Sequence, residues 1–280
     1  MIFFYIITPT FERRELLQKN LDSVASQSYP HFLHLVIDDS STMNSWDFLR
    51  ALPENSCQKF VRNETNQGVN FSRNRALDWV MQNTDSDFQN YIIFLDDDDF
   101  LAENVLTEMA QKIEKNPQKW IVTERAFENG NIITKAKNGE GEYNYVRDFL
   151  LGNNFSGDAT HWISTEILGE TRFFRDVKNA EEWGFFLELA TKTYFYFLYH
   201  KSTITSGYLA DGLTQQAFAS KIDLPFRRKM MRRMWGMIRT NFPEIFPTKS
   251  ILLYIYFLPI VHQISKFSLK IIRKIIKKFS

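Results

Sequence analysis

The chain has 280 residues, 44% hydrophobic and 24% charged, which is the composition of a folded protein with one large domain or a domain and an appendage. Its single cysteine, Cys57, excludes an internal disulfide framework and is typical of a reducing compartment. No stretch reaches the roughly 18 uninterrupted apolar residues of a membrane-spanning helix, so we expect none.

The net charge of +1 hides an asymmetry along the chain. Residues 225–280 contain 13 lysines and arginines against one acid, Glu244, whereas residues 1–224 carry an excess of 11 acidic side chains. Such an uneven split indicates that the two parts have different tasks.

The first hundred residues alternate short apolar runs with amphipathic stretches. The run "FFYIIT" at 3–8 predicts a buried strand, and 13–27 has apolar positions at helical spacing. The same alternation then predicts strand 32–39, a short helix 45–52, strand 58–63, helix 66–83, strand 91–97 and helix 103–116. Such an order indicates right-handed βαβ units, hence a parallel sheet with helices on both faces. Residues 117–215 are less regular, with a strand predicted at 119–127.

Four acids, Asp96 to Asp99, directly follow the apolar run at 92–95. Two unit charges about 4 Å apart repel by roughly 1 kcal/mol in water and by about 4 kcal/mol near a protein surface, so something must offset this repulsion. Taken alone, the run fits either a solvated acidic turn or a divalent-cation site at the carboxyl end of a buried strand.

Other polar groups are expected to join this run. The strand at 32–39 ends in Asp38 and Asp39, and the helix at 66–83 opens with Asn66, Gly68, Arg73 and Asn74. Because adjacent parallel strands bring their carboxyl ends together, these groups should share one crevice. Carboxylates hold Mg²⁺ or Mn²⁺, the cation and an arginine hold a diphosphate, and a carboxylate suits the imide N–H of uracil. The residues alone therefore predict a metal-assisted nucleotide-diphosphate site.

Three segments in this order and spacing resemble the family 2 glycosyltransferases of the GT-A fold: "IITPTFERRELLQKNLDSVASQSYPHFLHLVIDDSS", "NQGVNFSRNRAL" and "IIFLDDDDFL". The later "HWISTEIL" and "RFFRDVKNAEEWGFFLELA" resemble that family's acceptor half, where an acidic pair followed by Trp opens a helix. The resemblance covers about residues 1–200. It implies a Rossmann-like α/β fold with a mostly parallel central sheet and helices on both faces.

For the donor, the resemblance implies a nucleoside-cradling loop of Pro9, Thr10, Phe11 and Glu12. Phe11 would pack on the base, and the family more often has Asn at the position of Glu12. Asp39 is expected to bind uracil while Asp38 braces its loop. The nucleotide-binding helix would contribute Gly68, Arg73 and Asn74.

The acidic run matches the family's Asp-x-Asp signature. The site for Mn or Mg is expected at Asp96 and Asp98: Asp98 would bind the ion, and Asp96 would contact the ribose or a metal-bound water. Asp97 is a further residue expected in the nucleotide site, and Asp99 lies next to them. The cation and the diphosphate would then offset the repulsion among the four acids.

Glu182 matches the general base that takes the proton of the acceptor hydroxyl in an inverting transfer, while the metal stabilises the leaving nucleoside diphosphate. The family usually has Asp here with Glu before it, so Glu181 remains a second candidate. Glu181 could instead be an acid favoured by the helix dipole. Packing is favoured over acceptor binding for His161 and Trp162, and a structural role over metal binding for His200.

The basic end has the composition of a helix lying in a membrane interface. Residues 225–239 interleave cations with Met and Trp235, and 250–280 combine an apolar run with lysines facing isoleucines. Each cation near an acidic leaflet contributes about 1 kcal/mol of attraction. A helix closing over the catalytic domain, or a dimer contact, is the alternative. No recognition module accompanies the charge, so nucleic acid is not an expected partner.

We therefore predict an inverting hexosyl- or N-acetylhexosaminyl-transferase that moves a sugar from a UDP-sugar to a lipid-linked or cell-surface glycan, as in lipopolysaccharide, lipooligosaccharide or capsule assembly. Residues 1–100 would bind the nucleotide sugar, 101–215 the acceptor, and 216–280 the inner face of the plasma membrane from the cytoplasm.

Two alternative functions remain open. A Mg-dependent nucleotidyl- or phosphotransferase would use the same acids, but "TPTFERR" is not the Gly-rich loop that it needs after the first strand. The second alternative is a catalytically degenerate relative of the glycosyltransferases that docks on a membrane.

Overall fold

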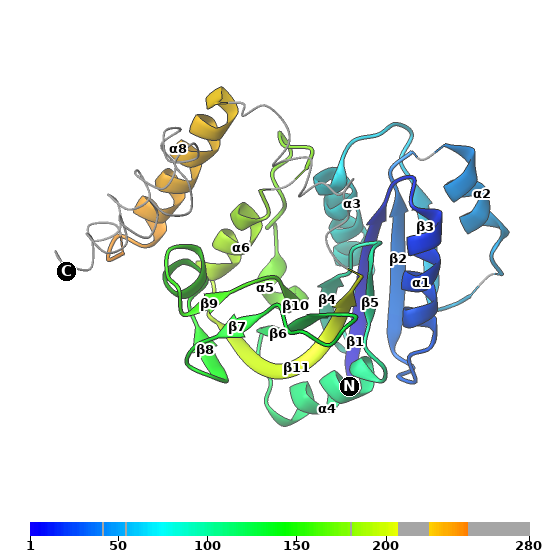
Figure 1. Ribbon diagram of the computed structural model, residues 1–280, viewed down its shortest axis with the longest axis horizontal. Coiled ribbons are helices and arrows are strands. Elements are labelled where there is room, and N and C mark those ends of the chain that lie inside the picture. Colours follow the sequence, from blue (N-terminus) through cyan, green and yellow to red (C-terminus); the bar gives the residue numbers. More distant parts are fainter. Residues whose placement is uncertain (41, 54, 180, 207–223, 246–280) are drawn as a thin grey trace. The chain divides into compact units, whose positions relative to one another are not determined.

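The computed structural model describes residues 1–40, 42–53, 55–179, 181–206 and 224–245 (Figure 1). The chain divides into two compact units, Met1–Phe218 and Ala219–Ser280. The first unit is a layered α/β domain. Both the apolar and basic segment at 250–280 and the end of the expected acceptor half lie outside the described residues.

A nine-stranded mixed sheet forms the centre of the first unit, in the order β3-β2-β1-β4-β10-β6-β11-β5, with β8 paired to β11. Its strands are β1 (Ile2–Thr10), β2 (Phe32–Asp38), β3 (Gln58–Arg62), β4 (Gln89–Phe94), β5 (Asp99–Leu101), β6 (Trp120–Phe127), β8 (Gly141–Tyr143), β10 (Ala159–Ser164) and β11 (Phe195–Thr205). A separate pair is formed by β7 (Lys135–Ala136) and β9 (Phe155–Ser156).

Helices cover both faces of this sheet. They are α1 (Arg14–Ala25), α2 (Met43–Ala51), α3 (Val69–Gln82), α4 (Val105–Lys115), the π-helix η1 (Tyr145–Leu150), α5 (Thr165–Leu168) and α6 (Trp183–Ala190). Val24 of α1 and Met109 of α4 share one buried cluster with Phe4 of β1. On the other face, the hydroxyl of Tyr5 donates to the carbonyl of Asn83 at the end of α3. The predicted arrangement of layers is confirmed.

The parallel strands place three predicted loops at one edge of the sheet. Strand β1 pairs in parallel with β2, with Thr10 opposite Asp38, and in parallel with β4, with Ile7 opposite Phe94. Burial on both faces explains why β1 is a continuous apolar run rather than an alternating one. The acid pair, the acid run and the loop after β1 therefore meet, as the sequence predicts.

The second half of the sheet differs from the regular alternation of the first. Strand β10 runs antiparallel between β4 and β6, with Trp162 opposite both Ile93 and Ile121. Strand β11 pairs with β6 and also with β5, where Thr205 lies opposite Asp99. These pairings bring β6 to the edge of the acid run.

Helix α8 (Leu224–Asn241) is the described part of the second unit. Met230, Met234 and Ile238 recur at helical spacing and are buried, whereas Arg232 and Arg239 are exposed, so the expected amphipathic pattern is present. Among the helices that the structure describes, none is long and apolar enough to cross a membrane.

Candidate active site

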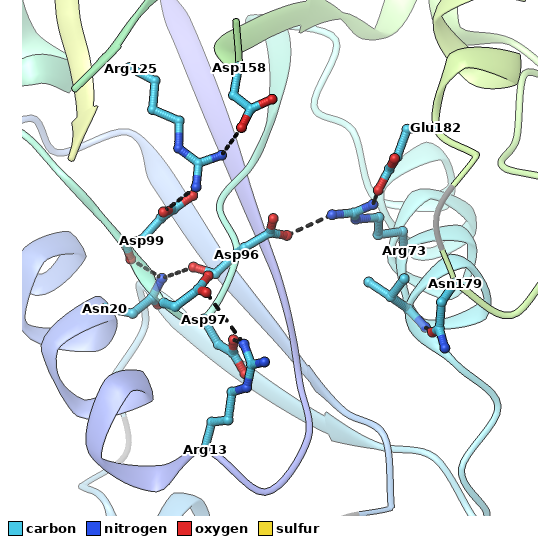
Figure 2. Close-up of polar contacts among 12 residues, drawn as sticks. Arg13, Asn20, Arg73, Asp96, Asp97, Asp99, Arg125, Asp158, Asn179 and Glu182 are labelled. Atoms are coloured by element: carbon cyan, nitrogen blue, oxygen red, sulfur yellow. Dashed lines mark hydrogen bonds and ion pairs between the residues drawn. The ribbon is translucent and has the colours of Figure 1, made fainter. Parts of the chain in front are cut away.

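The acid run forms a closed turn between β4 and β5, in which Asp99 donates its backbone N–H to the carbonyl of Asp96 at 3.0 Å. Asn20 of α1 is fully buried beneath this turn, and its amide donates to the carbonyls of Asp96 (3.0 Å) and Asp99 (2.8 Å) (Figure 2). A side chain of α1 therefore fixes the backbone that carries the carboxylates.

Three arginines from different parts of the fold pair with the four acids (Figure 2). One precedes α1, one lies on α3 and one on β6. The ion pairs are Arg13 Nη1 with Asp97 Oδ1 at 3.1 Å and Asp98 Oδ2 at 3.5 Å, Arg73 Nη2 with Asp96 Oδ1 at 2.6 Å, and Arg125 Nη2 with Asp99 Oδ1 at 2.6 Å. The repulsion is thus offset by the protein's own cations, an arrangement that the sequence analysis did not predict.

These pairs leave the four carboxyls with different proton affinities. Burial alone raises the pKa of Asp96, but Arg73 and Arg125 outweigh it and hold that pKa below its usual value. Burial raises the pKa of both Asp97 and Asp99 to about 7, against the opposing effect of their arginines. Burial and the charge of Asp96 also raise the pKa of Asp98. The fold therefore disfavours the charged forms of Asp97, Asp98 and Asp99, whereas it stabilises that of Asp96.

Asp96, Asp98 and Asp99 form a candidate metal centre, because one carboxylate oxygen from each lies within 4.8 Å of the others. An all-oxygen donor set suits Mg²⁺ or Mn²⁺. The two predicted ligands are brought together, and Asp99 is added to them. Asp97 also lines the pocket, but its Oδ2 accepts from the hydroxyl of Thr10 at 2.8 Å and its Oδ1 from Arg13, so its carboxylate braces the loop after β1.

Arg73 bridges the acid run to the candidate base. Its guanidinium donates from Nη2 to Asp96 and from Nη1 to Glu182 Oε1 at 3.0 Å, while only 8% of its side chain is exposed. The ring centroids of Phe94 and Phe173 lie 5.8 and 5.3 Å from Cζ of this guanidinium. Burial alone lowers the pKa of Arg73, but the two carboxylates raise it beyond its ordinary value, so the bridge stays charged.

The two candidate bases differ in what they contact. Glu181 has a left-handed backbone (φ 63°), and its carboxylate accepts a short hydrogen bond from the indole N–H of Trp183. Glu182 precedes α6, and its carboxylate points to Arg73 (Figure 2). Both line the pocket, but of the two it is Glu182 that Arg73 links to the acid run.

Asp39 fixes the start of α3 from the end of β2. Its Oδ1 accepts from Asn63 Nδ2 (2.8 Å) and the N–H of Gln67 (2.9 Å), and its Oδ2 from the N–H of Gly68 (2.7 Å). A carboxylate offers about four acceptor positions, so one remains on Oδ2 for a ligand donor. Asp39 therefore braces the start of α3, and the uracil contact expected of it is compatible with this role. Asp38 is fully buried, its carboxylate lies 3.5 Å from Arg62 Nε, and its carbonyl accepts from the N–H of Asn63 (2.8 Å), which fits the bracing role expected of it.

The start of α3 is also joined to the segment before the candidate base. Gly68 has φ 93°, and an added Cβ would lie 2.5 Å from the carbonyl oxygen of Lys178. The N–H groups of Val69 and Asn70 donate to Asn179 Oδ1 (3.1 Å) and to the same Lys178 carbonyl (3.0 Å). The loop that leads to Glu181 and Glu182 is therefore anchored on the nucleotide-side helix.

Asn74 differs from the other residues predicted to bind the nucleotide or the metal, because it does not line the pocket. Its amide donates to the carbonyl of Phe173 (2.9 Å) and accepts from the N–H of the same residue (2.8 Å). The structure thus gives Asn74 a positioning role: it holds the segment whose aromatic ring packs on Arg73.

The loop after β1 places its side chains at the pocket edge. Phe11 is 44% exposed, which leaves its ring accessible for stacking. Glu12 has φ 57°, and its carboxylate accepts from the hydroxyl of Thr42 (3.0 Å) and from the Thr42 N–H before α2. Because Asn tolerates this left-handed conformation well, the backbone here suits the Asn that the resembling family more often carries.

A pocket of about 940 Å³ unites these groups within the first unit. The loop after β1, Asp39, Gly68 and the acids line it. Aromatic side chains line it as well, namely those of Tyr145, Phe149, Phe155, Trp183, Phe186 and Phe195. His161 is also a lining residue, stacked on Phe186, and burial lowers its pKa to about 3. Trp162 is fully buried, and His200 bonds to Glu108 (2.6 Å), so the structure bears out packing and structural roles for both.

Residues 5–177 match the family described as Glycosyl transferase family 2. A GalNAc(5)-diNAcBac-PP-undecaprenol beta-1,3-glucosyltransferase of Campylobacter jejuni is 26% identical over 185 residues, which span 64% of this chain and 55% of that protein, so the match covers about half of the relative's length.

Solved structures share the fold. S. aureus TarS 1-349 in complex with UDP-GlcNAc has a TM-score of 0.69 at 18% identity, covering 86% of this chain and 68% of that one. A mannosyltransferase from Pyrobaculum calidifontis in complex with GDP-Man and Mn²⁺ has a TM-score of 0.52 at 15% identity, covering 91% and 69%.

Gly68→Ala is expected to destabilise the first unit and displace the loop before Glu182, because the new Cβ must push the backbone of Lys178 away. Gly130→Ala is a matched control: Gly130 has φ 85° but nothing within 4 Å of an added Cβ. Both variants incur the backbone cost of about 1 kcal/mol, and Gly68→Ala should lose at least about 1–3 kcal/mol more. Urea unfolding measures this, and equal losses would contradict the proposed contact.

Asp98→Asn is expected to raise the melting temperature in metal-free buffer at pH 8, by about 2 °C for each ~1 kcal/mol that burial and the charge of Asp96 cost the ionised carboxylate. The raised pKa of Asp98 means that its charged form is disfavoured in the fold, and the amide removes that charge. Asp96→Asn should lower the melting temperature, because the depressed pKa of Asp96 marks a charge that stabilises the fold above pH ~4 and is lost on acidification. Scanning calorimetry of both variants tests these two predictions. Melting-temperature shifts of the same sign for Asp98→Asn and Asp96→Asn would refute them.

Proposed function

Because the chain belongs to glycosyl transferase family 2, and is therefore a glycosyltransferase, we propose that it transfers a sugar from a UDP-sugar to a lipid-linked or cell-surface glycan with inversion at the anomeric carbon. One observation carries the proposal. The acids, an arginine suited to phosphate and the candidate base line a single pocket. The undecaprenol-linked substrate named for the Campylobacter relative, and the UDP-GlcNAc held by the S. aureus structure, support the substrate classes.

In this proposal the loop after β1 and Asp39 hold the nucleoside. Phe11 offers an exposed ring for the base, and Asp39 Oδ2 has one acceptor position for the imide N–H of uracil. Pro9, Thr10 and Glu12 shape the loop around them. Because the N–H groups of Gln67 and Gly68 bond to Asp39, base recognition is tied to the helix that carries Arg73.

Asp96, Asp98 and Asp99 are proposed to hold Mn²⁺ or Mg²⁺, since their clustered oxygens match the ligands that these ions prefer. When bound, the ion supplies Lewis-acid stabilisation of the departing diphosphate. Arg73 adds a permanent cation that suits phosphate oxygens. The all-oxygen set does not resemble a zinc site.

Glu182 is proposed as the base that takes the proton from the acceptor hydroxyl as that oxygen attacks the anomeric carbon. Its carboxylate lies in the pocket, and Arg73 fixes one of its oxygens, which leaves the other to receive the proton. Glu181 is the weaker candidate, because its carboxylate is engaged by Trp183.

The second unit is proposed to attach the enzyme peripherally to the inner face of the plasma membrane, which would bring a lipid-linked acceptor to the pocket from the cytoplasm. Exposed arginines of α8, including Arg232 and Arg239, suit anionic headgroups. The basic composition of residues 246–280 supports the same role.

Release of UDP from a panel of UDP-sugars, with water as the surrogate acceptor, tests both the function and the base. Wild type should release UDP in a Mn²⁺- or Mg²⁺-dependent manner. Glu182→Gln should be about 10²–10⁴-fold slower, because its amide can still accept from Arg73 but cannot take a proton.

Glu181→Gln is the matched control and should stay within about 10-fold of wild type. Equal losses for the two variants would contradict the assignment of Glu182. A wild type that neither binds UDP nor releases it from any UDP-sugar would contradict the proposed function.

A further inference from the structure

His161 of β10 lines the pocket, and none of the roles proposed so far uses it. Its imidazole is partly exposed and stacks on the ring of Phe186, with 4.2 Å between the two ring centroids. Phe186 lies one helical turn after Glu182, and its N–H donates to the carbonyl of Glu182 at 3.3 Å. A residue that contacts His161 is therefore within one turn of the candidate base.

Trp120 fixes the tautomer of this imidazole. The indole N–H of Trp120 donates to Nδ1 of His161 at 3.1 Å. An indole nitrogen can only donate, so Nδ1 must be the acceptor, and the hydrogen of the neutral ring is then on Nε2. Trp120 is 1% exposed, and its ring packs on those of Tyr145 and Phe195, so the indole is itself held in place.

The imidazole is also held neutral. Burial lowers the pKa of His161 to about 3, so the ring carries no charge from about pH 4 upward. A charged imidazolium would add a second N–H at Nδ1, which faces the indole donor of Trp120. His161 is therefore a poor proton carrier near neutral pH and does not compete with Glu182 for the role of base.

The remaining ring nitrogen is available to a ligand. In the described part of the chain, Nε2 of His161 makes no hydrogen bond, and it is not among the polar atoms that are both buried and unpartnered, so it is open to the pocket. Packing, the role expected from the sequence, does not explain an N–H group that faces the pocket without a partner.

The surroundings of this N–H group suit a sugar ring. Phe149 and Phe186 are partly exposed and line the same pocket, so they offer apolar surface to the C–H groups of a sugar. A fixed donor among apolar side chains sets the orientation of a small molecule through one oxygen atom. Hydroxyl and acetamido oxygens of a sugar both accept such a hydrogen bond.

We propose that His161 is a fixed, uncharged hydrogen-bond donor to the acceptor sugar, and that Trp120 is the positioning residue that maintains its Nε2–H tautomer. This inference rests on the proposed transfer to a glycan. Nε2 donates to one oxygen of the acceptor sugar, while another hydroxyl of the same sugar is presented to Glu182. An acceptor without an oxygen at that place would leave the N–H unpaired, which lowers its affinity.

Transfer to simple glycosides separates acceptor binding from donor binding. Octyl glycosides of glucose, galactose and N-acetylglucosamine are supplied together with the UDP-sugar from which wild type releases UDP fastest. For the glycoside that accelerates this release most, His161→Phe should raise the acceptor KM about 10-fold, while the calorimetric affinity for UDP with Mn²⁺ stays within about twofold.

Two further variants control for the loss of the ring. His161→Gln should keep the acceptor KM within about threefold of wild type, because its amide N–H can take the place of Nε2–H. His31→Phe is the matched control and should change neither quantity. His31 is also partly exposed and packs on an aromatic ring, that of Phe88, but it does not line the pocket.

Histidine-selected ¹H–¹⁵N spectra between pH 5 and pH 9 test the tautomer directly. The signals that His161→Gln removes should show a protonated Nε2 and an unprotonated Nδ1 throughout this range. Trp120→Phe removes the indole donor. It should give a mixture of the two neutral tautomers and a higher acceptor KM.

Four results would overturn the inference. Equal weakening of UDP and glycoside by His161→Phe would show that the ring only packs, and an unchanged acceptor KM would show that the acceptor does not reach Nε2. A protonated Nδ1, or titration of His161 between pH 5 and pH 9, would remove the fixed neutral donor. A wild type that releases UDP but is accelerated by none of the glycosides would contradict a sugar acceptor here. Failure to release UDP at all is a different result, because it defeats the proposed function itself.

Discussion

The mutual repulsion of four consecutive carboxylates is the constraint on which this site depends. Three arginines from separate parts of the fold offset this repulsion: one lies just before α1, one on α3 and one on β6. A buried amide from α1 holds the turn that presents the acids. Strand order explains how these elements meet: β1, β2 and β4 end at one edge, and the antiparallel β10 brings β6 beside them. The acids can remain adjacent because every neighbouring layer supplies a counter-charge.

The compensation is incomplete, and that incompleteness suits the proposed function. Arg73 over-stabilises the charge of Asp96, whereas Asp98 keeps a raised pKa despite Arg13. A divalent cation at these oxygens would offset the cost of keeping the buried carboxylates charged. Sites of this kind lower stability in exchange for activity. Arg73 also contacts Glu182, so one buried cation aligns the donor-side acids with the candidate base.

Sequence reasoning predicted the first half of the fold and most of the charged residues that line the pocket, because apolar periodicity and acids at strand ends are local signals. It missed Arg13 and Arg125, whose partners lie 84 and 26 residues away and carry no local signature. An arginine inside the otherwise apolar strand "WIVTERAF" was the available clue to Arg125. The role of Asn74 was not foreseen either, because only the folded chain shows that its amide clamps Phe173. The antiparallel placement of β10 depends on pairing with strands that are distant in the sequence, which no short sequence pattern predicts.

The most direct test of this account is calorimetric titration of UDP, with and without Mn²⁺, into wild type and Asp98→Asn in mild detergent. The account predicts Mn²⁺-dependent UDP binding by wild type. Asp98→Asn should lose that dependence while remaining folded, because the substitution removes a metal ligand and relieves repulsion. Binding of UDP that is equally tight in both proteins and indifferent to Mn²⁺ would contradict the claim that the clustered acids form a metal-assisted diphosphate site.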